Sequence, residues 1–239
     1  MIDHVSIRVS DRPLSERFYD SVLAPLGIER TAWGEEGVEW SDFTIAPVAP
    51  RKGLTRRLHV AFDARSRSDV DRFWRAGTQA GFQNDGPPGL RPHYDRQYYG
   101  AFLRDPDGNS VEAVHNGRDR PGQFDHLWLR VMDVPRARRF YELIAPYSGY
   151  ELDHADGVFA HFVGEDASLS LVAGEPTEHL HLAFGANDNA IVEAFHRAAV
   201  EAGYPDNGPP REWGYHPGYF GAFVLDADGN NIEVVCHNR

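Results

Sequence analysis

The chain has 239 residues, of which 41% are hydrophobic and 25% charged, as is usual for a folded globular protein. Its formal net charge of −12 argues against binding to nucleic acid or to an anionic membrane surface, because both attract basic patches. The single cysteine, Cys236, excludes an intrachain disulfide, and the lack of a signal peptide or of an apolar run long enough to span a membrane leads us to expect a cytoplasmic protein.

An internal duplication organises the chain. The segment HVAFDA that begins at His59 returns as HLAFGA at His181, and the turn DPDGN at Asp105 returns as DADGN at Asp226. A repeat of this length is typical of a duplicated domain, since solenoid repeats are much shorter. We therefore predict two domains with a short linker: residues 1–117, residues 123–239, and the linker 118–122.

Each half begins with the alternation of apolar and polar residues that is typical of a strand. In the first half Val5, Ile7 and Val9 are the apolar positions. A helix is expected next, with Pro13 near its start and Gly27 after its end. The second half has equivalent residues in the same order.

Strand-like runs follow at 38–48 in the first half and at 158–172 in the second. The strand with His59 starts another unit of the same kind, in which Ser68-Asp-Val-Asp71 fits a capping box at a helix start. Two strands joined by the DPDGN turn close the first half. Strands and helices in this order predict an α+β fold of four similar units.

Two histidines and a glutamate recur in both halves. His4 lies on the polar face of the first strand, His59 opens the equivalent strand of the next unit, and Glu112 lies in the last strand. If the two units of one half fold back into a cupped sheet, these side chains can bind a divalent metal with coordination positions left open. The counterparts in the second half are His126, His181 and Glu233.

Ordinary histidines in strands are the alternative explanation. With 12 histidines in 239 residues, one histidine at one position carries no weight. Both halves keep the same three residue types, however, while neighbouring positions have diverged, as in Ser6 and Trp128. An exposed structural histidine should have diverged too, so we favour metal binding.

Asp-His-Val near the start, Leu-His-Val-Ala-Phe in the middle and Tyr-Tyr-Gly-Ala-Phe with Asp-Pro-Asp-Gly-Asn near the end form an ordered set of motifs. This set resembles the vicinal oxygen chelate superfamily, which includes glyoxalase I, bleomycin-resistance proteins and extradiol dioxygenases. The resemblance implies βαβββ modules paired into two cup-shaped domains of mixed sheet, with helices on the outer face and a divalent metal in each cup. Its ligand positions map onto one set per half: His4, His59 and Glu112; His126, His181 and Glu233.

The His-His-Glu combination is most similar to that of the extradiol dioxygenases. Their pattern has a tyrosine shortly before the closing turn, and this chain has Phe102 and Phe223 there instead. The phenylalanines remove a hydroxyl that would hydrogen-bond a substrate oxygen. Dioxygenase-like and lyase- or isomerase-like reactions therefore both stay open.

Other polar residues are candidates for roles beside the metal. His93 and His216 are candidate acid–base residues, because an imidazole transfers protons near neutral pH, although each could equally be a surface-loop histidine. Two arginines could hold a substrate anion or pair with an acidic residue, and two tyrosines could line the cup or pack in it. These four candidate substrate residues are Arg8, Arg130, Tyr98 and Tyr219.

The leading hypothesis is a divalent-metal-dependent enzyme that coordinates two neighbouring oxygens of a small molecule. The alternative is a non-catalytic protein that sequesters an antibiotic or another small molecule. Fe²⁺, Mn²⁺, Ni²⁺ and Zn²⁺ all accept these ligands, so the sequence leaves the ion open. The second copy could also substitute for a homodimer partner, so both a monomer and a homodimer stay open.

Overall fold

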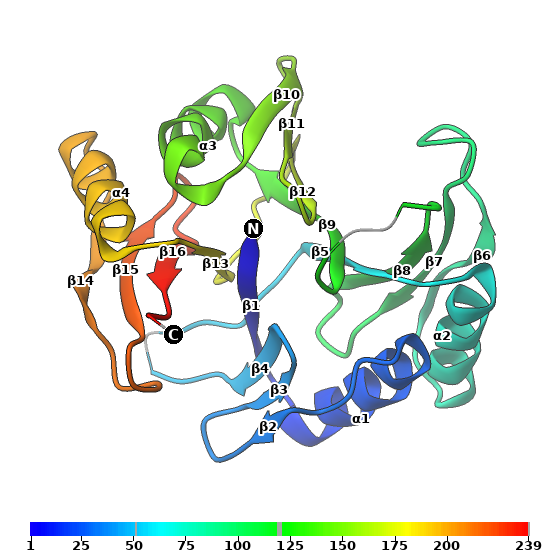
Figure 1. Ribbon diagram of the computed structural model, residues 1–239. Helices are drawn as coiled ribbons and strands as arrows, with labels where there is room; N and C mark the ends of the chain where they lie inside the picture. Colours follow the sequence, from blue (N-terminus) through cyan, green and yellow to red (C-terminus); the bar gives the residue numbers. More distant parts are fainter. Residues whose placement is uncertain (51, 119–120, 239) are drawn as a thin grey trace.

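The computed structural model describes residues 1–50, 52–118 and 121–238, so Asp119 and Arg120 of the predicted linker lie outside the described residues. Four βαβββ units make up the chain (Figure 1). The first unit contains β1 (Ile2–Val9), α1 (Arg12–Leu23) with a 3₁₀ turn (Ala24–Leu26), β2 (Ala32–Trp33), β3 (Val38–Trp40) and β4 (Phe43–Pro47). The second contains β5 (Leu58–Asp63), α2 (Arg67–Gln79), β6 (Asn84–Leu90), β7 (Tyr99–Arg104) and β8 (Ser110–His115).

The second half repeats this order. Its first unit contains β9 (Phe124–Val131), α3 (Val134–Ser148), β10 (Glu151–Ala155), β11 (Phe159–Val163) and β12 (Ser168–Ala173). The last unit contains β13 (His181–Gly185), α4 (Asn189–Glu201), β14 (Asp206–Glu212), β15 (Phe220–Leu225) and β16 (Asn231–Cys236). The predicted boundary between the halves falls between β8 and β9, and it stays a prediction.

The strands form two mixed eight-stranded sheets, in the orders β14-β15-β16-β13-β1-β4-β3-β2 and β10-β11-β12-β9-β5-β8-β7-β6. Within a unit the first and last strands are parallel, and the other neighbours are antiparallel. The units are joined by two antiparallel pairs, β1 with β13 and β5 with β9. Each sheet therefore takes one unit from each half. The α+β fold with four βαβββ units is confirmed, with the helices on the outside (Figure 1).

The expectation that the two units of one half share a sheet is wrong. The first strand of each unit lies at an open edge of its own four strands, where it needs a partner. Helix α1 packs against α2 and α3 against α4, so the units of one half meet through their helices (Figure 1). Their strand edges consequently pair with units of the other half.

Local sequence signals explain most helix starts. Asp11 caps α1 by accepting a hydrogen bond from the backbone N–H of Leu14, and Pro13 lies in the first turn. Helix α2 begins before the predicted Ser68, because the Ser66 hydroxyl caps it by accepting a hydrogen bond from the Asp69 backbone N–H and also donates one to the Asp69 carboxylate. No helix of the described ranges is both long and apolar enough to cross a membrane.

Strands β6 and β14 contain proline pairs and were not predicted as strands. Each is the outermost strand of its sheet, where a missing backbone N–H leaves no partner unsatisfied.

The DPDGN turn between β7 and β8 is a structural hairpin turn. The buried Asp105 carboxylate accepts hydrogen bonds from the backbone N–H groups of Asp107 and Asn109 and from the Tyr19 hydroxyl. This turn fixes the start of β8, which carries Glu112.

Candidate metal centres

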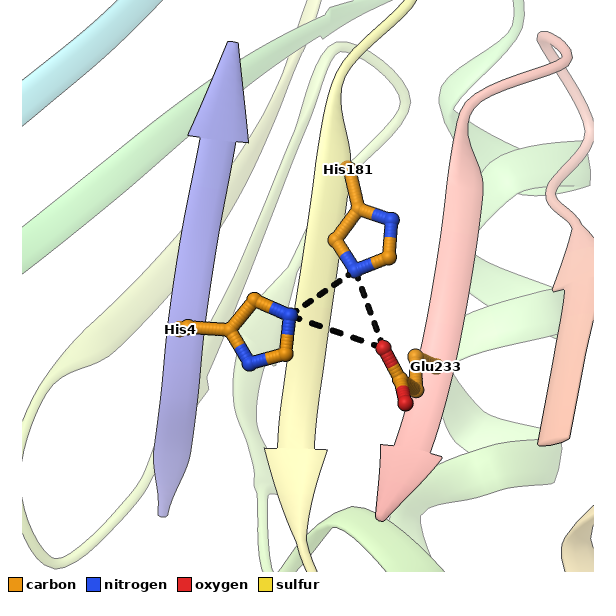
Figure 2. Close-up of side chains that lie close together, drawn as sticks. All are labelled: His4, His181 and Glu233. Atoms are coloured by element: carbon orange, nitrogen blue, oxygen red, sulfur yellow. Dashed lines mark hydrogen bonds and ion pairs between the residues drawn. The ribbon is translucent and has the colours of Figure 1, made fainter. Parts of the chain in front are cut away.

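Three side chains converge from neighbouring strands in the sheet that contains β1. His4 comes from β1, His181 from β13 and Glu233 from β16 (Figure 2). The Nε2 atoms of the two histidines lie 3.0 Å apart. Glu233 Oε2 lies 3.0 Å from His181 Nε2 and 3.5 Å from His4 Nε2. We call these three residues the His4 centre.

An equivalent group lies in the other sheet. His59 Nε2 is 3.1 Å from Glu112 Oε2 and 3.1 Å from His126 Nε2. The third separation, from His126 Nε2 to Glu112 Oε2, is 3.5 Å. We call these residues the His59 centre. In both groups the ligand atoms lie within 4.8 Å of one another.

The six predicted ligand residues therefore do come together, but the predicted grouping is wrong. In each centre one histidine comes from one half of the chain, and the other histidine and the glutamate come from the other half. His4 of the first half joins His181 and Glu233, and His126 of the second half joins His59 and Glu112. The cause is the strand pairing, because His4 faces a strand of the last unit and His126 faces β5. Neither half holds a complete set of three neighbouring ligands.

Strand register explains how the ligands converge. His4, Ala183 and Glu233 lie side by side on three adjacent strands, and His181 is two residues before Ala183 on the same face. In the other sheet Ala61 takes the place of Ala183, between His126 and Glu112. An alanine between larger ligands leaves space above its methyl group.

The spacing of the ligand atoms fits a divalent cation. Two atoms that each bind one ion at about 2.1 Å and at a right angle lie about 3.0 Å apart. The separations of 3.0 to 3.5 Å in both centres agree with this geometry. Glu112 and Glu233 have fully buried side chains, and a buried carboxylate requires a compensating charge. The histidines remain 7% to 23% exposed, so a small molecule can reach the ligands.

Further contacts orient the ligands in both centres. Asp3 Oδ1 accepts a hydrogen bond from His4 Nδ1 at 2.7 Å, and Asp125 does the same for His126 at 2.8 Å. These bonds leave each Nε2 lone pair free to bind a cation. Sequence reasoning missed both aspartates, although an Asp-His pair occurs at the same place in each half.

Tyr98 and Tyr219 hold the glutamates. The Tyr98 hydroxyl donates to Glu112 Oε1 at 2.6 Å, and the Tyr219 hydroxyl donates to Glu233 Oε1 at 2.7 Å. Both tyrosines were predicted as substrate residues, and the structure places their hydroxyls on the far oxygen of the ligand carboxylate. Burial, followed by the nearby glutamate charge, raises the pKa of both tyrosines, so they stay protonated donors.

Burial also shifts the pKa of the ligands. It raises the pKa of Glu233 to about 7 and lowers the pKa of His181 to about 4. Burial likewise lowers the pKa of His59. The two imidazoles are therefore neutral at pH 7, which is the form that binds a metal.

The two candidate acid–base histidines differ in position. His93 is exposed, its ring is tilted against that of Tyr94, and it lines a cavity together with His126. His216 Nε2 lies 2.8 Å from His237 Nδ1, and His237 Nε2 donates to Asp3 Oδ2 at 2.8 Å. His216 is thus connected to His4 through the side chains of His237 and Asp3, and His237 is a third residue that sequence reasoning missed.

A cavity of about 400 Å³ opens beside the His59 centre. Its lining includes Glu112, His59 and Arg130, together with the aromatic side chains of Trp128 and Phe102. A second cavity of about 360 Å³ is lined by His126 and His93, and it shares Trp128 with the first. The corresponding arginine of the His4 centre, Arg8, donates a hydrogen bond to the Pro47 carbonyl.

Comparison with known proteins agrees with the fold. Residues 1–113 match the sequence model of the glyoxalase/bleomycin resistance protein/dioxygenase superfamily. Glyoxalase I from Zea mays has a similar structure, with a TM-score of 0.66 and 20% identity over 99% of this chain and 92% of the maize chain. Its V278E variant gives a TM-score of 0.68, also at 20% identity and with the same coverage.

A protein from Bacillus subtilis for which dioxygenase activity is suggested is also similar, with a TM-score of 0.64 and 16% identity over 100% of this chain and 85% of that one. At these identities the likeness establishes the fold alone. Among proteins with curated descriptions, no sequence matches the chain significantly.

Proposed function

We propose that this chain is a divalent-metal-dependent enzyme of the glyoxalase/bleomycin resistance protein/dioxygenase superfamily, whose sequence model matches residues 1–113. Its substrate is a small molecule that coordinates through two neighbouring oxygens. The observation that carries this proposal is the convergence of two imidazole nitrogens and one carboxylate oxygen at two places in the fold.

The ligands suit Fe²⁺, Mn²⁺, Ni²⁺ or Zn²⁺ equally. Such a cation, when bound, supplies Lewis-acid chemistry at the substrate oxygens or, if it is redox-active, oxygen chemistry. Three protein ligands per centre leave positions for both substrate oxygens, which a site closed by four protein ligands would not.

The residues around each centre hold the ligands in the binding form. Asp3 and Asp125 keep a proton on Nδ1 of His4 and His126, so that Nε2 presents its lone pair. Tyr98 and Tyr219 direct one oxygen of each glutamate away from the ion position and leave the other facing the histidines.

Proton transfer at the His4 centre is assigned to His216 and His237. Their hydrogen-bonded chain runs from Asp3, which holds the Nδ1 proton of His4, to the partly exposed His216, which suits exchange of a proton with solvent. His93 has no corresponding hydrogen-bonded chain to the His59 centre among the described residues, although its ring contacts Tyr94, which in turn contacts Tyr98. An acid–base role for His93 therefore remains a prediction.

Metal-dependent binding of a chelator tests the proposed function. Protein stripped with EDTA is reloaded with Zn²⁺ or, without oxygen, with Fe²⁺, and binding of acetohydroxamate is measured by calorimetry against acetamide as the monodentate control. We expect acetohydroxamate to bind only the loaded protein. Binding that is indifferent to metal would contradict the proposal and favour sequestration of small molecules, the alternative function.

A further inference from the structure

The two centres share their ligands and differ in the side chains beside them. On β9 the side chains of His126, Trp128 and Arg130 alternate onto one face, about 7 Å apart along the strand. The same positions of β1 carry His4, a serine and Arg8. Along β9 this face therefore presents a metal ligand, an aromatic ring and a cationic side chain, in that order.

Trp128 forms an aromatic wall at the His59 centre. Its ring centroid lies 5.4 Å from that of His59 and 5.8 Å from that of His126. Tyr94 meets Trp128 edge to face at 5.9 Å, and Phe102 lies 6.1 Å from His59. Aromatic rings beside the ligands favour a substrate with a planar apolar part.

Ser6 occupies the position of this wall in the His4 centre. Ser6 pairs with His181 across the strands, as Trp128 pairs with His59. The backbone register is therefore the same in both centres. The two centres differ here only in the side chain, because Ser6 has no aromatic ring on which the planar part of a substrate could pack.

Among the described residues, Arg130 is the arginine of the cavity that has no acidic partner. Two other arginines line it, but Arg57 pairs with Glu178 at 2.7 Å and Arg104 pairs with Asp85 at 2.9 Å. The Arg130 guanidinium is exposed and has no acidic partner among the described residues. An anionic group on a bound molecule would give it one, in a bidentate geometry that suits a carboxylate.

We propose that Trp128 and Arg130 make the His59 centre selective for a chelating substrate with a planar apolar body and a carboxylate at its far end. The inference rests on the proposed function, because the chelating end needs a bound cation. Four residues that line one cavity set the order of the substrate groups: the oxygens face His59 and Glu112, the planar body lies beside Trp128, and the carboxylate meets Arg130. A cavity of about 400 Å³ accommodates a molecule of this size. The His4 centre lacks the wall and does not share this selectivity.

Single-centre proteins allow the test. The variant H4A/H181A keeps only the His59 centre, and H59A/H126A keeps only the His4 centre. Both are loaded with Zn²⁺, and calorimetry measures three hydroxamates that differ in one feature at a time: acetohydroxamate, benzohydroxamate and 4-carboxybenzohydroxamate. The readout is the ratio of affinities within each protein, which cancels differences in folding or zinc content.

In H4A/H181A we expect benzohydroxamate to bind about fivefold more tightly than acetohydroxamate, because of ring contacts. The carboxylate should add about tenfold or more through Arg130. Adding W128S, which installs the residue of the duplicate position, should remove the first gain. Adding R130Q should remove the second.

The matched control uses the other centre. H59A/H126A should show neither gain, and adding S6W to it should introduce a preference for benzohydroxamate over acetohydroxamate. Equal ratios in the two single-centre proteins, or ratios that W128S and R130Q leave unchanged, would overturn the inference. A failure to retain zinc, or to bind acetohydroxamate at all, would instead overturn the proposed function on which it rests.

Discussion

Nε2 of His4 and Nε2 of His181 lie 3.0 Å apart, although the residues are 177 positions apart in the sequence. The antiparallel pairing of β1 with β13 brings them together, and β5 with β9 does the same for His59 and His126. Each centre thus joins the two halves of the chain. Binding at either centre should consequently affect the stability of the whole protein.

Removing the metal should destabilise the protein. At a free Zn²⁺ concentration of a thousand times Kd, each centre contributes about 4 kcal/mol, which corresponds to about 10 °C in Tm for a chain of this size. Calorimetric unfolding with excess Zn²⁺ and after EDTA treatment measures the shift. The H4A/H59A variant, in which both centres lose a ligand, is the control and should show little dependence on zinc. A wild-type Tm that stays the same while zinc binds would contradict this prediction.

Tyr219→Phe should weaken metal binding at the His4 centre by about tenfold or more, as is typical when a contact that orients a ligand is lost. The substitution removes the hydroxyl that donates to Glu233 Oε1 and keeps the ring. Competition with a chromophoric chelator in the H59A/H126A background gives the affinity.

Tyr215→Phe is the matched control for this change, because Tyr215 lies four residues away and is 66% exposed. Among the described residues its hydroxyl makes no hydrogen bond to a ligand, so its removal should leave the metal affinity within about twofold. Equal effects of the two substitutions would show that the Tyr219 hydroxyl does not orient Glu233.

Metal affinity at the His4 centre should fall below pH 7. Burial raises the pKa of Glu233 to about 7 in the metal-free protein, so below that pH a cation has to displace a proton from the carboxylate. Above pH 7 the carboxylate is ionised and this cost disappears. From Glu233 alone the apparent affinity should drop by about tenfold per pH unit below 7.

Calorimetry of Zn²⁺ binding to H59A/H126A, in buffers of different ionisation enthalpy, measures both the affinity and the protons released. Protonation of His181 adds no pH dependence to the zinc affinity between pH 5.5 and 7.5, because burial lowers the pKa of His181 to about 4. An affinity that stays constant between pH 5.5 and 7.5 would be incompatible with a protonated Glu233.

The sequence was sufficient to identify the six residues that converge, because the duplication displays each of three positions twice. It was not sufficient to group them. All four units have the same strand pattern, and nothing local to His4 distinguishes pairing with β5 from pairing with β13. That choice depends on how the helices of each half pack against one another, which is a property of the assembled fold.

The supporting residues were partly accessible from the sequence. Asp3 and Asp125 precede the first histidine in both halves, so the repeat alone could have identified them. Tyr98 and Tyr219 were found as aligned residues, but their contact with the glutamates depends on strand pairing between β7 and β8 and between β15 and β16. The hydrogen-bonded chain from His216 to Asp3 belongs to the His4 centre alone among the described residues, since at the His59 centre Asn116 takes the corresponding place beside Asp125.

The zinc stoichiometry of two double variants tests the central claim, that each centre combines ligands from both halves. The account predicts that H4A/H181A, with both changes in one centre, retains one zinc ion per chain. It predicts that H4A/H59A, with one change in each centre, retains none. Elemental analysis after dialysis against buffered zinc gives both values. One ion in H4A/H59A and none in H4A/H181A would contradict the account and place a complete site within each half.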